Sequence, residues 1–133
     1  MNKILSFMSM ISWVIIDSRD ALKKDIYRIS RKINPQCPND FIICIDLLLK
    51  EHEEKTRRKI YEVMCSEGFL QEFPEFRSIM KLGLSEFKQT VLFILALNIN
   101  IDDISKILLS NRESIMTVRS YLKRMHGEYL SMK

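Results

Sequence analysis

Residues 84–125 hold three short segments whose apolar residues recur at helical spacing, and this pattern constrains the fold more than any other. In the first segment the apolar residues recur at three- and four-residue intervals: Phe87, Val91, Leu92, Leu95 and Ala96. Ser85 precedes them, and serine is favoured at a helix N-terminus. Asn98 follows them, and asparagine tolerates the left-handed conformation that ends many helices. The pattern predicts a helix that starts at Ser85 and a joint at Asn98-Ile99.

The second and third segments begin with polar residues that can cap a helix. Asn100 stands three residues before Asp103, and Ser110 stands three residues before Glu113. This spacing is typical of capping boxes. The second helix is expected to be barely two turns long and to bury an apolar stripe: Ile101, Ile104, Ile107 and Leu108. The third is expected to start near Asn111 or Arg112 and to bury Ile115, Val118, Leu122 and Met125.

The composition also favours helices. The 133 residues include only three glycines and three prolines, and 47% of them are hydrophobic. We find no convincing strand-period alternation. The length suits one compact domain with a core, plus an appendage. We therefore expect an all-α fold, in which a helical N-terminal region and a long helix precede a C-terminal helix-turn-helix bundle.

Three dipeptides occur in register within the C-terminal stretch: Leu84-Ser85, Ile104-Ser105 and Ser114-Ile115. They match the Leu-Thr opening, the Ile-Ala pair of the second helix and the Thr-Val pair of the recognition helix in LuxR-type (NarL/FixJ-like) helix-turn-helix domains. The stretch therefore resembles that family of bacterial transcription regulators. Asn98 stands where the family usually has glycine, and Met116 stands where a polar base reader is common. The resemblance implies a LuxR-like bundle that binds double-stranded DNA in the major groove.

The resemblance also implies which residues contact DNA. The residues facing base edges would be Glu113, Ser114, Met116, Thr117 and Ser120. The cations holding phosphates would be Lys106, Arg112, Arg119, Lys123 and Arg124. Residues 112–125 include four basic residues and one acidic residue, Glu113. Positive charge is therefore concentrated on the expected recognition helix. Related domains bind paired half-sites, so we also expect a homodimer.

Residues 41–65 are expected to form one long helix with apolar ends and a charged centre, KEHEEKTRRK, that projects into solvent. We expect Gly68 to break this helix. Aromatic residues and a proline follow and are expected to cluster: Phe69, Phe73, Pro74 and Phe76. The Phe-Pro-Glu-Phe phrase ahead of the helix-turn-helix resembles regulators of the Bacteroidetes type, and with it the resemblance covers roughly residues 41–126. The same aromatic residues would also brace the first helix of the DNA-binding domain.

The N-terminal region combines an apolar run with a basic amphipathic helix. Residues 4–16 are apolar apart from three serines, and this run is shorter than the roughly 20 residues that cross a membrane as a helix. It reads as a packed or oligomerising helix, a membrane-surface helix or a truncated anchor. Residues 17–33 continue helically, with cations opposite an apolar stripe, so membrane association of residues 1–33 stays open. The proline-containing residues 34–40 are expected to form a linker.

The sequence offers little for catalysis or metal binding. It has no glycine-rich phosphate loop and no histidine beside a plausible nucleophile. Its three cysteines form no CxxC pair, and its two histidines form no recognised ligand spacing. We expect no enzyme activity, no catalytic residues, no cofactor and no metal. An odd number of cysteines without a convincing secretory signal favours a cytoplasmic location, with membrane attachment through the N-terminus left open.

These observations define two candidate functions. The first is a DNA-binding transcription regulator, and the alternative is a helical protein-interaction or membrane-associated module with a degenerate helix-turn-helix. We expect three regions: a hydrophobic and basic helical segment (1–39), a long connecting helix with an aromatic segment (40–83) and a helix-turn-helix DNA-binding domain (84–133).

Overall fold

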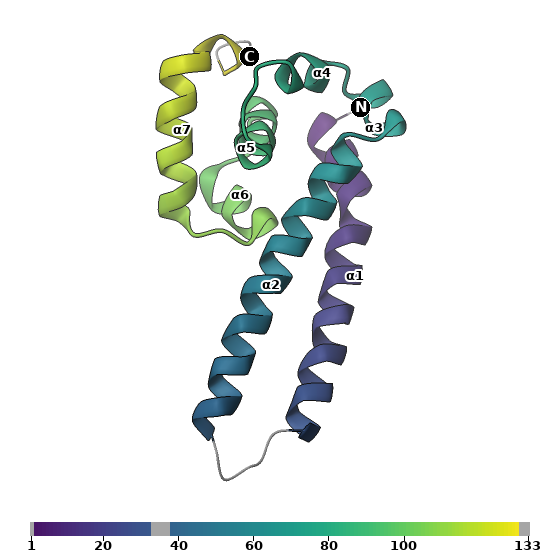
Figure 1. Cartoon of the computed structure of the whole chain (residues 1–133). Helices are drawn as coiled ribbons and strands as arrows, with labels where there is room; N and C mark the ends of the chain where they lie inside the picture. The colour runs from purple at the N-terminus through teal and green to yellow at the C-terminus, as the bar shows by residue number, and fades with distance from the viewer. Residues whose placement is uncertain (1, 33–37, 131–133) are drawn as a thin grey trace.

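The computed structural model describes residues 2–32 and 38–130, apart from the side chains of residues 38–41. Within these ranges every regular element is a helix, which confirms the all-α prediction (Figure 1). The elements are α1 (Lys3–Lys32), α2 (Pro38–Met64), α3 (Glu67–Glu72), α4 (Glu75–Met80), α5 (Glu86–Ala96), α6 (Ile101–Leu108), α7 (Arg112–His126) and the 3-10 turn η1 (Gly127–Tyr129).

The two longest helices, α1 and α2, pack side by side along their length. Figure 1 shows them extending well beyond the C-terminal helices. The apolar run and the basic segment of the N-terminal region form one continuous helix, as predicted. None of the described helices contains an apolar stretch of the length that a membrane span requires.

The predicted linker over residues 34–40 is wrong at its C-terminal end, because α2 already begins at Pro38. Proline suits the first position of a helix, where its fixed φ is helical and its missing N–H would have no intrahelical partner. The rest of that linker, residues 34–37, lies outside the described residues.

The end of α2 also differs from the prediction. Gly68 was expected to break the long helix, but α2 ends at Met64 and Gly68 lies inside α3. The local signal is Ser66, whose side chain accepts a hydrogen bond of 3.3 Å from the backbone N–H of Phe69. This N-cap starts a new helix before the glycine is reached.

Phe93 of α5 lies at the centre of the hydrophobic core. Its ring centroid is 5.7 Å from that of Phe7, 5.5 Å from Phe69, 5.3 Å from Phe73 and 5.4 Å from Phe76. All five rings are fully buried. The predicted aromatic cluster of α3 and α4 is therefore confirmed for its three phenylalanines, and it also packs on α1 and α5. One core of buried side chains runs from α1 to α7, through all three predicted regions.

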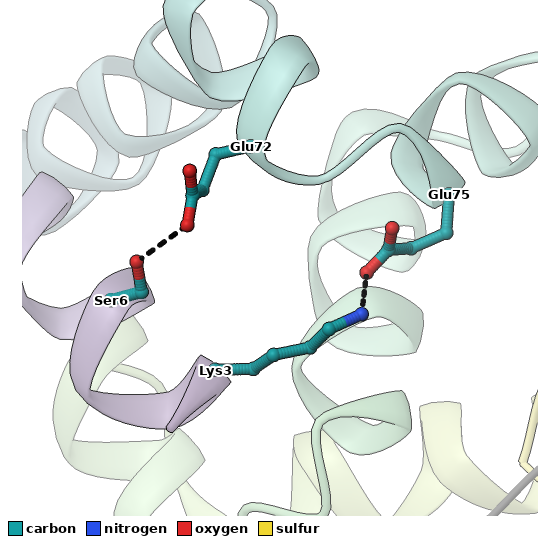
Figure 2. Close-up of polar contacts among 4 residues, drawn as sticks. All are labelled: Lys3, Ser6, Glu72 and Glu75. Atoms are coloured by element: carbon teal, nitrogen blue, oxygen red, sulfur yellow. Dashed lines mark hydrogen bonds and ion pairs between the residues drawn. The ribbon is translucent and has the colours of Figure 1, made fainter. Parts of the chain in front are cut away.

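Two polar contacts lie at the edge of this core and connect the first turn of α1 to α3 and α4 (Figure 2). The ammonium group of Lys3 is 3.2 Å from a carboxylate oxygen of Glu75. The hydroxyl of Ser6 donates a hydrogen bond of 3.0 Å to Glu72. Both contacts are solvent-exposed, so they orient α1 more than they stabilise it.

We predict that Phe93→Ala lowers the free energy of unfolding by about 3–5 kcal/mol, because the cavity would face four other rings. Phe87→Ala is the matched control, because Phe87 belongs to the same helix but is only partly buried. Urea denaturation of both variants measures the difference. Equal losses would contradict the central position of Phe93.

Candidate nucleic-acid interface

Helices α5, α6 and α7 pack against one another and form what we call the C-terminal unit. Each begins with a side-chain cap. Ser85 accepts a hydrogen bond from the backbone N–H of Lys88 at 3.3 Å, and Asn100 accepts one from Asp103 at 2.8 Å, as predicted. The third helix begins after Asn111, whose side chain accepts a bond of 2.7 Å from Ser114.

The capping-box pattern predicted that Ser110 caps α7, and this prediction is wrong because Asn111 is the N-cap. Ser110 pairs instead with α6: its backbone N–H donates to the carbonyl of Ser105 at 3.1 Å, and its own carbonyl accepts a short hydrogen bond from the Ser105 hydroxyl. These two bonds close the turn between α6 and α7. The predicted second-helix pair Ile104-Ser105 thus supplies one buried residue and one residue that fixes the turn.

Two described residues other than glycine adopt left-handed backbone conformations, one after α5 and one after α6. Asn98 has φ of 70°, as predicted for the joint between α5 and α6. Leu109 has φ of 51° at the end of α6, which the sequence did not indicate. A left-handed conformation costs a leucine about 1–2 kcal/mol, so other contacts must hold this turn.

Arg57 of α2 provides such a contact. Its Nη1 donates hydrogen bonds to the backbone carbonyls of Leu108 at 3.0 Å and Leu109 at 2.9 Å. The predicted solvent exposure of the charged centre of α2 is therefore wrong for Arg57, and also for Thr56, which is buried. Because both acceptors are at the C-terminus of α6, the guanidinium also meets the negative end of that helix dipole.

Tyr61, one turn further along α2, contacts the start of the C-terminal unit. Its hydroxyl donates to the side-chain oxygen of Gln89 at 2.9 Å, and the amide nitrogen of Gln89 donates to the carbonyl of Leu84 at 2.8 Å. Burial raises the pKa of Tyr61 to about 12, so its hydroxyl remains a donor even in alkaline solution, where an ordinary tyrosine ionises. Helix α2 is thus bonded to both ends of the α5–α6 pair.

The outward surface of α7 carries most of the residues expected to face base edges. Glu113, Met116, Thr117 and Ser120 are exposed, whereas Ser114 is half-buried. Met116 is 39% exposed. The hydroxyl of Thr117 donates a hydrogen bond of 3.0 Å to the carbonyl of Glu113. This surface is therefore largely polar, with one apolar side chain in the middle.

The cations expected to hold phosphates are distributed over more than one surface. Arg112, Arg119 and Lys123 line a groove on one flank of α7, beside the joint between α5 and α6. Arg124 instead lies over the ring of Tyr121, which Lys88 of α5 also contacts. Lys106 is exposed on α6. Three of the five cations thus lie together.

The three cations of the groove differ in their partners. Arg112 forms an ion pair of 3.1 Å with Asp102, so part of its charge is already balanced. Arg119 is half-buried, and its Nε atom is buried without a hydrogen-bond partner among the described residues. Lys123 is exposed.

The buried side of α7 is narrower than predicted. Ile115 and Leu122 are fully buried, Val118 is half-buried, and Met125 is 54% exposed. At 100° per residue, Met125 lies roughly 60° around the helix from Leu122, which moves it off the buried line. The prediction that Met125 is buried is therefore wrong.

Comparison of the chain with protein-family models, with curated proteins and with solved structures found no match in any of the three.

We predict that Arg57→Met lowers the free energy of unfolding by about 1.5–3 kcal/mol, because it removes charged hydrogen bonds to two carbonyls. Arg58→Met is the matched control: Arg58 is the next residue and is exposed, so its loss should stay within about 0.5 kcal/mol. Urea denaturation checks both values, and a similar small effect for both variants would show that the Arg57 contact does not stabilise the turn.

Proposed function

We propose that the chain is a DNA-binding transcription regulator in which α7 enters the major groove of duplex DNA. The observation that carries the proposal is the division of the α7 surface into an outward polar side and a cationic flank. Such a division is what a recognition helix needs, because base contacts discriminate between sequences while phosphate contacts position the protein. A cytoplasmic location would accompany this function.

The polar side of α7 is suited to base edges. Ser120 and Glu113 are exposed and free to reach them, while Thr117 would have to exchange its bond to the Glu113 carbonyl for one to a base. Met116 offers an apolar contact of the kind that a thymine methyl group accepts. This residue set would therefore read hydrogen-bonding groups and a methyl group together.

The cationic flank is suited to the DNA backbone. Arg119 and Lys123 are its principal cations, because Arg112 is already paired with Asp102. A phosphate oxygen beside this flank would contact the exposed ammonium group of Lys123. Neutralising a phosphate also releases condensed counterions, which makes such binding strongly dependent on salt.

A second candidate function is a helical protein-interaction or membrane-associated module. The exposed Met116 on α7 favours it, as do the exposed apolar side chains of α1 and α2, among them Trp13 and Leu47. In that case α7 would be a packing element, and the cations on its flank would have no specific role with nucleic acid.

Duplex DNA affinity measured against salt concentration separates the two candidates. We predict salt-sensitive binding by the wild type, and a salt slope reduced by about 1 in Lys123→Ala. Lys81→Ala is the matched control, because Lys81 is exposed but lies outside α7, and its slope should be unchanged. Absence of salt-sensitive binding by the wild type would reject DNA binding in favour of the second candidate.

A further inference from the structure

A cleft lies between α2 and the C-terminal unit, beside the Arg57 contact. Residues of α2 and α5 form its two walls, and Leu108 of α6 completes the lining. Its volume is about 180 Å³. An apolar cavity of roughly 150 Å³ is large enough to hold benzene. The cleft therefore suits a molecule slightly larger than benzene, about the size of a single amino acid.

Charged groups of both signs line this cleft. Glu54, Arg57 and Arg58 come from α2, and Glu86 comes from the first turn of α5. Arg57 is already bonded to the end of α6. The other three side chains are exposed, and within the described ranges none of them forms an ion pair. A positive charge from α2 and a negative charge from α5 are therefore both available to a ligand.

The remaining lining groups offer mainly apolar surface. The hydroxyl of Tyr61 already donates to a glutamine side chain of α5 at 2.9 Å, and the hydroxyl of Thr90 donates to a backbone carbonyl of α5 at 2.9 Å. Phe87 is half-buried and Leu108 is buried. Beside the charged groups, a ligand would therefore contact the apolar side chains of Phe87 and Leu108.

We propose that this cleft binds a small zwitterion, an α-amino acid with an apolar side chain. A simple anion would face two carboxylates, and a simple cation would face two guanidinium groups, so only a molecule with both charges complements the whole lining. The carboxylate of the ligand pairs with Arg58, whose planar guanidinium group matches a carboxylate in shape. Its ammonium group pairs with Glu86, and its side chain contacts Phe87 and Leu108.

The bound amino acid joins α2 to the C-terminal unit, because its two charged groups bond to different helices. Arg58 belongs to α2 and Glu86 to α5. The ligand therefore adds to the attachment that Arg57 makes in the same cleft, and it stabilises the folded chain. This inference does not depend on DNA binding, and its test contains no DNA.

Isothermal titration calorimetry of the full-length chain tests the proposal. The probes are L-leucine, L-methionine and L-phenylalanine at millimolar concentration, and we expect at least L-leucine to bind. Isocaproate is L-leucine without the amino group, and isoamylamine is L-leucine without the carboxylate. Each should bind at least about tenfold more weakly than L-leucine, because each loses one charged pair.

Two variants test the assigned contacts. Arg58→Met should weaken the binding of L-leucine at least about tenfold. Lys59→Met is the matched control, because Lys59 is the next residue, is exposed and does not line the cleft, so its affinity should be unchanged. Glu86→Gln should weaken the binding of L-leucine but not that of isocaproate, which has no ammonium group to pair with Glu86.

Circular dichroism should show the same helix content in the wild type and in all three variants, because the substituted side chains are exposed. If none of the three amino acids bound to the folded wild type, the proposal would be overturned. It would also be overturned by isocaproate or isoamylamine binding as tightly as L-leucine, or by equal losses in Arg58→Met and Lys59→Met.

Discussion

The packing of Phe93 among four other phenylalanine rings is the interaction on which the rest of the structure depends. The rings come from α1, α3, α4, α5 and the short link between α3 and α4, so this cluster joins the start of the chain to the first helix of the C-terminal unit. Aromatic residues contribute large buried areas, and their edge-to-face arrangement adds a geometric preference. The core therefore fixes α5, and α5 in turn fixes α6 and α7.

Hydrogen bonds from α2 also help to hold the proposed recognition helix, α7, in place. Arg57 bonds to the turn before α7, and Tyr61 bonds through Gln89 to Leu84, two residues before α5. A rigid α2 would therefore transmit its own position to α7.

The sequence predicted several features that depend on nearby residues, missed others such as the N-caps at Ser66 and Asn111, and did not indicate contacts between distant residues. The caps at Ser85 and Asn100 and the left-handed joint at Asn98 follow from side-chain chemistry within a few residues, and all three were confirmed. The left-handed Leu109 was missed because its turn is held by Arg57, which is 52 residues away. For the same reason the exposed cations of α7 could be named from the sequence, but the grouping of Arg112, Arg119 and Lys123 beside the α5–α6 joint could not.

The central claim is that the N-terminal part of α1 and the C-terminal unit belong to one cooperative structure built around Phe93. Native-state hydrogen exchange tests it most directly, because it gives the free energy of opening for each segment. The account predicts that the amides around Phe7 and Ile11 in α1 and those of α5 open together, with the free energy of global unfolding. It would be contradicted if the amides of α1 exchanged through a much smaller opening while α5, α6 and α7 stayed fully protected.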